Sequence, residues 1–201
     1  GFSLTIIAVT EAVVLILLCA AAGIMTLFGM KFRKVFLWGL ISLAVPPLAI
    51  LYGHVVEINR VKVRNIEIVS ERLPEAFDGY RIAHISDLHL LSFEDRHDRL
   101  EEFIDKVNSL SPDLIVFSGD LVTYSPEETA GFEDILSALN APDGVYSVLG
   151  NHDYCIYNDD IPEDMKAAAA AEVARRQEKF GWDVLMNENV EIERTSEAGD
   201  T

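Results

Sequence analysis

The 201-residue sequence carries a formal net charge of −17, and half of its residues are hydrophobic. The excess of acidic residues argues against a nucleic-acid-binding protein, which needs basic patches to contact phosphates. The two cysteines, Cys19 and Cys155, provide neither a disulfide framework nor the C-x-x-C spacing of a metal site. Hydrophobic residues dominate positions 1–58 and most acidic residues follow position 65, so we expect two parts in different physical environments.

The N-terminal part, residues 1–58, is predicted to be a transmembrane helical hairpin. Residues 12–30 and 35–56 are apolar runs close to the length of about 20 residues that crosses a bilayer, and the basic stretch KFRK separates them. Basic loops tend to be cytoplasmic, although further basic residues after the second run pull the other way. The short basic loop favours an extracytoplasmic location for the rest of the chain.

The next segment, residues 59–72, is expected to form a linker and a first strand, because VKVRNIEIV alternates apolar and polar residues. Residues 73–201 are then expected to form an α/β domain. Three short apolar runs in this domain are typical of buried strands, at residues 81–86, 114–119 and 145–150.

Helical patterns separate these runs. Residues 96–110 are amphipathic, Ser125 begins a capping box that predicts a second helix, and DMKAAAAAEVARRQEKF is rich in strong helix formers. The second helix is expected to carry Phe132, Ile135, Leu136 and Leu139 on one face. Strands that alternate with helices at these lengths predict a parallel sheet with helical crossovers.

Polar side chains follow three of the predicted strands. If the extended geometry continues, Asp87 and His89 lie on the same face, and a carboxylate with an imidazole suits a divalent metal. Taken alone, this pair could also be a solvated strand end. However, parallel strands bring their carboxyl ends to one edge, where ligands bind. The residues that follow the three strands are Asp87 and His89, then Asp120, and then Asn151, His152 and Asp153.

The motifs RIAHISDLHL, PDLIVFSGDLV and GVYSVLGNHDY resemble the bacterial membrane-anchored branch of the calcineurin-like metallophosphoesterase superfamily. The resemblance runs from about residue 73 to residue 190. It implies a four-layered α/β sandwich around two mixed sheets, with two divalent metal ions. Oxygen and nitrogen ligands without a thiolate point to Mn, Fe or Zn.

The resemblance also implies roles for individual residues. Asp87 and His89 would bind the first metal, Asp120 would bridge both metals, and Asn151 would bind the second through its amide oxygen. His152 would stabilise or protonate the leaving oxygen of the substrate. Asp153 would orient His152.

The expected activity is therefore hydrolysis of a phosphate ester or pyrophosphate by a metal-activated water. A membrane anchor would suit a lipid-linked substrate. The family completes its site with a later histidine and a G-H-x-H motif, and neither occurs here, since His152 is the last histidine. We therefore expect the sequence to hold the N-terminal portion of the domain and to be inactive as given. The alternative is a non-catalytic membrane sensor or scaffold with a degenerate domain.

Overall fold

The computed structural model describes residues 2–29, 31–53 and 60–194. The chain divides into two compact units, with the boundary between Arg64 and Asn65. The domain boundary expected at residue 58, and the end of the second apolar run, lie outside the described residues. The two units are considered separately below.

The first unit contains two helices, α1 (Phe2–Thr26) and α2 (Phe32–Tyr52). They pack closely at one point, because a Cβ atom built on Gly39 of α2 would meet the side chain of Leu18 on α1. Within the described part of the chain, no helix combines the length and apolarity needed to cross a membrane.

The prediction of two transmembrane helices is therefore wrong. Both helices form where the apolar runs predicted them, but the expectation of spanning rested on length and apolarity alone. The helices as described do not meet that criterion. The predicted sidedness of the second unit depended on the two spans and loses its basis with them.

The stretch VKVRNIEIV, residues 61–69, which is predicted to form a first strand, is not a strand. Its apolar side chains are strongly exposed, with Ile66, Ile68 and Val69 each more than four-fifths accessible to solvent. Alternating polarity is insufficient for strand formation because a strand also needs a neighbour to complete its hydrogen bonds. Among the described residues, this segment has no such neighbour.

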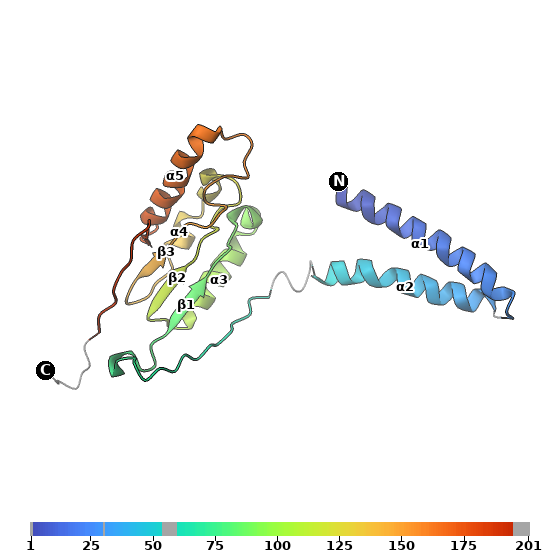
Figure 1. Ribbon diagram of the computed structural model, residues 1–201, viewed down its shortest axis with the longest axis horizontal. Coiled ribbons are helices and arrows are strands. Elements are labelled where there is room, and N and C mark those ends of the chain that lie inside the picture. Colours follow the sequence, from blue (N-terminus) through green and yellow to red (C-terminus); the bar gives the residue numbers. More distant parts are fainter. Residues whose placement is uncertain (1, 30, 54–59, 195–201) are drawn as a thin grey trace. The chain divides into compact units, whose positions relative to one another are not determined.

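The second unit contains one sheet of four parallel strands in the order β1-β2-β3-β4. Figure 1 shows β1, β2 and β3 side by side. The expected α/β class and parallel sheet are confirmed, whereas the four-layered arrangement with two mixed sheets is not found in the described residues. The strands are β1 (Ile82–Ile85), β2 (Leu114–Phe117), β3 (Val145–Ser147) and β4 (Asp183–Val184).

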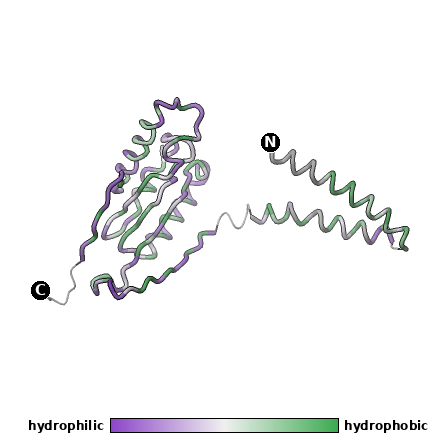
Figure 2. Tube along the Cα trace, in the orientation of Figure 1, coloured by the Kyte–Doolittle hydropathy of each residue, from purple (hydrophilic) through white to green (hydrophobic). Residues whose placement is uncertain are grey.

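Three helices connect the strands, and all three contribute to a single hydrophobic core. They are α3 (His97–Ser109), α4 (Glu133–Leu136) and α5 (Lys166–Lys179). Right-handed crossovers between strands in sequential order bring every helix to the same face. The core side of the sheet includes Ile85, Ile115 and Val145, whereas Ile82 on the opposite face is 57% exposed. In Figure 2 the strand region is largely hydrophobic, while the loop that precedes α5 is hydrophilic.

The second predicted helix is broken. The capping box at Ser125 forms as expected, but it begins a short 3-10 helix, Pro126–Thr129. Gly131 then adopts a left-handed backbone with φ of 85°, which an α-helix does not accommodate. The helix α4 begins only after this residue, and its Leu136 still reaches the core. The apolar periodicity therefore correctly predicted that this segment packs against the core, but it wrongly predicted one continuous helix.

Polar and charged side chains meet at the amino edge of the sheet in an amino-edge cluster, which consists of Tyr80, Asp113, Asp143 and Arg194. The Arg194 guanidinium pairs with Asp113 at 2.7 Å and with Asp143 at 3.3 Å, and it lies over the Tyr80 ring. The Tyr80 hydroxyl donates to Asp143. A hydrogen bond from the Arg81 N–H, supported by Arg194, lowers the pKa of Asp113, whereas burial raises that of Tyr80. The cluster ties residue 194 to the sheet.

Candidate metal centre

The loop after β1 does not continue the extended geometry of the strand. Both Asp87 and His89 have left-handed backbones, with φ of 56° and 46°. Their N–H groups donate to the carbonyl oxygens of Gly119 and Asp120 at 3.0 and 3.1 Å. The argument that two extended residues share a face is therefore wrong. The two side chains nevertheless approach each other, with 3.9 Å between the Asp87 Oδ1 and His89 Nε2 atoms.

Two glycines let the loops after β2 and β3 approach closely. Gly119 has φ of 97°, and a Cβ atom there would collide with the backbone of Gly150. A Cβ atom on Gly150 would in turn collide with Asp120. Because both positions lack a side chain, Asp120 Oδ1 can accept the His152 N–H at 2.8 Å. Asp120 itself has a left-handed backbone with φ of 61°, and such strain concentrates at functional sites.

The side chain of Asp153 links the loops after β2 and β3 through hydrogen bonds. Its carboxylate is fully buried and accepts four backbone N–H groups at 2.8–3.1 Å, from Asp120, Leu121, Val122 and Gly150. Burial raises the pKa of this carboxyl, and the hydrogen bonds from the backbone oppose that shift. Each oxygen accepts two bonds, so the group uses its acceptor capacity as an ionised carboxylate would.

His152 has a different partner from the one expected. Its Nδ1 atom lies 2.8 Å from the carbonyl oxygen of Thr123, in the loop after β2. Since a carbonyl only accepts, Nδ1 carries the proton and Nε2 is left available. Asp153 therefore influences His152 through the loop backbones, and the direct orienting partner is Thr123. Sequence analysis missed this contact because a backbone carbonyl leaves no signature in residue type.

Three side chains that follow the three strands converge at the carboxyl edge. His89, Asp120 and His152 each offer a ligand atom, and these atoms all lie within 4.8 Å of one another. The His89 and His152 rings are perpendicular, with 4.7 Å between their centroids. The buried Nδ1 atom of His89 has no hydrogen-bond partner among the described residues. A buried imidazole nitrogen without a partner, beside a carboxylate and a second imidazole, fits a divalent metal ion.

The remaining predicted ligands lie at the border of this group. The Asp87 side chain is 64% exposed and contacts His89. Asn151 is exposed, and its Nδ2 donates to the hydroxyl of Tyr157 at 3.1 Å. The Tyr157 ring also lies 4.5 Å from the His152 ring, centroid to centroid. Tyr157 was not identified from the sequence, because nothing in its spacing marks it as a contact of both residues.

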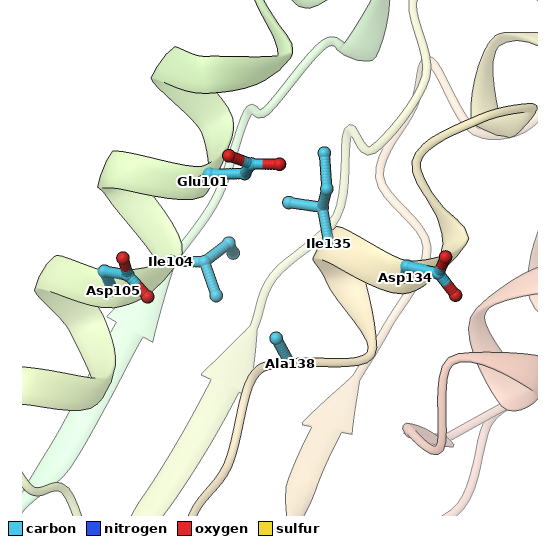
Figure 3. Close-up of a pocket in the computed structure, with 6 residues that line it drawn as sticks. All are labelled: Glu101, Ile104, Asp105, Asp134, Ile135 and Ala138. Atoms are coloured by element: carbon cyan, nitrogen blue, oxygen red, sulfur yellow. The ribbon is translucent and has the colours of Figure 1, made fainter.

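A separate pocket of about 210 Å³ lies between α3 and α4 (Figure 3). Ile104 and Ile135 lie across from each other in it, and carboxylates lie around it. These acidic side chains do not form a metal-type group in the described residues, where only the carboxyl-edge triad does. The pocket is therefore distinct from the candidate metal centre.

Comparison with known proteins identifies the relatives of this chain. It is 40% identical over 119 residues to the UDP-2,3-diacylglucosamine pyrophosphatase LpxG of Chlamydia muridarum, covering 57% of this chain and 35% of that protein. It is 32% identical over 128 residues to the uncharacterised metallophosphoesterase YkuE of Bacillus subtilis, covering 62% and 44% of the two chains. A transmembrane protein with metallophosphoesterase domain from Danio rerio is 32% identical over 114 residues, covering 57% and 26%.

The chain thus spans less than half the length of each of these relatives. No solved structure matches it significantly. The profile of the calcineurin-like phosphoesterase family matches residues 80–193, which is more than half of the chain and includes every residue of the candidate metal centre. The chain therefore belongs to the calcineurin-like phosphoesterase family.

Proposed function

We propose that the full-length protein is a dimetal phosphoesterase that hydrolyses a phosphate ester or pyrophosphate bond. The observation that carries the proposal is the convergence of His89, Asp120 and His152 at the carboxyl edge of the sheet. This convergence lies within the region that matches a phosphoesterase family. Family membership supports a metal-dependent hydrolase, and the convergence supports the position of its metal centre.

Each residue of the metal centre has its own role in this proposal. Asp87 and His89 would hold one ion, Asp120 would contribute to both, and Asn151 would hold the other through its amide oxygen. When bound, two divalent cations neutralise the phosphate charge and activate the attacking water. Thr123 accepts a hydrogen bond from His152 Nδ1, which leaves Nε2 for the leaving oxygen. To donate a proton to that oxygen, Nε2 must carry one of its own, so His152 would act as an imidazolium that becomes neutral when the leaving group departs.

The ligand set favours Mn, Fe or Zn, because it combines carboxylate, imidazole and amide groups. Cys155 lies close by in sequence but does not suit a thiolate ligand. Its side chain is fully buried, and burial raises its pKa to about 11. A thiol with that pKa stays protonated at neutral pH.

Exposed apolar side chains in the three loops that carry the metal centre, here called the apolar rim, favour a lipid-linked substrate. The rim comprises Leu91, Tyr124 and Ile156, one from each of the loops that follow β1, β2 and β3, and each is 43–46% exposed. Each lies within two positions of a residue that contacts the site. The relative from Chlamydia muridarum is named for a diacylated nucleotide sugar. A lipid-linked substrate also agrees with membrane association, which the name of the Danio rerio relative supports.

The proposal is tested by metal-dependent turnover of the full-length protein. Hydrolysis of bis-p-nitrophenyl phosphate should disappear after exhaustive chelation and return with Mn²⁺. Undiminished turnover after chelation would contradict the metal mechanism, and no turnover with any metal would favour the non-catalytic alternative.

The substrate class is tested separately. The variants Leu91→Ser and Ile156→Ser should raise KM for UDP-2,3-diacylglucosamine by about tenfold each, because a serine removes most of the apolar contact area. Their effect on KM for water-soluble bis-p-nitrophenyl phosphate should be much smaller. Equal effects on both substrates would argue against the apolar rim as a lipid contact.

A further inference from the structure

The side chain of Tyr157 contacts two residues of the candidate metal centre at once. Its hydroxyl accepts a hydrogen bond from Asn151 Nδ2 at 3.1 Å, and its ring lies 4.5 Å from the His152 ring with a tilt of 37°. These contacts close the turn that follows β3. The ring is 51% exposed and is not part of the hydrophobic core, so packing of the domain does not explain its position.

The hydrogen bond decides which end of the Asn151 amide is available. An amide has a donor nitrogen on one side and an acceptor oxygen on the other. Because Tyr157 holds the nitrogen, the Oδ1 atom points away from the hydroxyl and has no other partner among the described residues. Divalent cations bind amides through oxygen, so this orientation is the one that a ligand needs.

The contact of the Tyr157 ring restrains His152. Thr123 holds His152 at Nδ1, but a single hydrogen bond still permits the imidazole plane to rotate about it. The Tyr157 ring lies against one side of this plane, and the His89 ring lies perpendicular to it on another. The imidazole is therefore restrained by a hydrogen bond and two aromatic contacts.

We propose that Tyr157 is a positioning residue for the metal centre, which orients Asn151 through its hydroxyl and His152 through its ring. The proposal rests on the dimetal function proposed above. It makes a separable prediction, because the hydroxyl should govern binding of a metal ion and the ring should govern turnover. Residues that orient a metal ligand typically change metal affinity by 10- to 100-fold when removed.

Three variants of the full-length protein separate the two contacts. Tyr157→Phe removes only the hydroxyl, and Tyr157→Leu removes the hydroxyl and the ring. Tyr154→Phe is the matched control, because this tyrosine is 46% exposed in the same turn and its hydroxyl has no partner among the described residues. Asn151→Ala serves as the reference for loss of the amide ligand. Mn²⁺ is titrated calorimetrically into each metal-free protein, and turnover of bis-p-nitrophenyl phosphate is measured against Mn²⁺ concentration.

Tyr157→Phe should weaken binding of the second Mn²⁺ equivalent by about tenfold and leave the first equivalent unchanged. High Mn²⁺ should restore its turnover. Tyr157→Leu should show the same weakening together with a fall in kcat of about tenfold or more that Mn²⁺ does not restore. Tyr154→Phe should retain wild-type Mn²⁺ affinity.

Several outcomes would overturn the proposal. If Tyr157→Phe binds Mn²⁺ like the wild type while Asn151→Ala loses the second equivalent, the dimetal function stands and the role of Tyr157 is wrong. An equal loss of affinity in Tyr154→Phe would show that the effect is not specific. If the wild-type protein itself binds only one equivalent, or none, then the dimetal function fails and this proposal fails with it.

Discussion

The two edges of the parallel sheet differ in whether their charged side chains are paired with an opposite charge within the chain. At the amino edge, Arg194 pairs with both Asp113 and Asp143, and Tyr80 completes the cluster. At the carboxyl edge, the carboxylate of Asp120 faces two imidazoles, and its described hydrogen bond comes from a backbone N–H. The first arrangement is complete within the chain. The second arrangement brings together electron-pair donors that would coordinate a cation.

The backbone shows the same difference. Asp87, His89 and Asp120 at the carboxyl edge all have positive φ, a conformation that is unfavourable for residues with a side chain. Hydrogen bonds between the loops hold them there. The positions of the amino-edge cluster are not among the positive-φ residues of the described chain. Positive φ also occurs at Ser111 before β2, but only at the carboxyl edge do such backbones coincide with unmatched charge, which is where function is expected to lie.

The largest expected effect is that of Asp120→Asn, which removes the negative charge at the centre of the carboxyl-edge site. An amide cannot neutralise the charge of a bound cation, so metal content and turnover of the full-length protein should be lost together. Turnover should fall below about one hundredth of the wild-type value. Metal content by mass spectrometry and hydrolysis of bis-p-nitrophenyl phosphate provide the measurement. Retention of a full metal complement would remove Asp120 from the ligand set.

His152→Ala distinguishes a proton donor from a ligand. If His152 acts on the leaving oxygen, kcat should fall about 10²- to 10⁴-fold while the metal remains bound. His97→Ala is the control, because this histidine contacts Phe132 outside the metal centre, and its turnover should stay within about twofold of wild type. Loss of metal in His152→Ala would identify His152 as a ligand, consistent with its place in the triad.

Asp153→Asn tests whether the buried Asp153 carboxylate stabilises the loops that carry the metal centre. An asparagine offers one acceptor oxygen, so about two of the four N–H groups would lose their partner in a buried site. At about 1–3 kcal/mol for each unsatisfied group, the free energy of unfolding should fall by about 2–6 kcal/mol. Asp159→Asn, at an exposed position, should change it by less than about 0.5 kcal/mol. Urea denaturation compares the two, and equal effects would refute the supporting role.

Sequence alone located most elements that depend on local pattern. The helices α3 and α5 and the strands β1, β2 and β3 lie within the predicted segments, because hydrophobic periodicity and helix propensity are local properties. The order of the motifs also predicted that residues after the three strands meet at one edge, and His89, Asp120 and His152 do so. This success follows from the topology of parallel sheets, which fixes where strand ends meet.

The helix after Ser125 was interrupted locally, at the left-handed backbone of Gly131. The other failures have tertiary causes, and the strand expected at residues 61–69 lacked a neighbour. Likewise, the left-handed backbone of His89 depends on bonds to the adjacent loop, and the Thr123 carbonyl that holds His152 is invisible in residue type. These features arise from contacts between segments far apart in sequence, which a local pattern does not encode.

The smallest expected effect concerns the amino edge and its response to pH. The folded-state pKa of Asp113 is lowered from its ordinary value of 3.8, chiefly by the hydrogen bond from the Arg81 N–H and with support from Arg194. Stability from an acid with a lowered pKa is present above its unfolded pKa and disappears as the pH falls through its folded pKa. The coupling between Asp113 and Arg194 should therefore be fully present above the ordinary pKa of 3.8 and disappear only as the pH falls through the lowered pKa of Asp113.

A double-mutant cycle with Asp113→Asn and Arg194→Ala measures this coupling through the free energy of unfolding of the full-length protein. At pH 7 the coupling should be small, because solvent screens a pair that is only partly buried. Both residues lie outside the metal centre, so turnover at pH 7 should change little in either variant. A coupling that stays constant as the pH falls far below 3.8 would show that the carboxylate charge of Asp113 is not its source. A large loss of turnover would show that the two edges of the sheet are not independent.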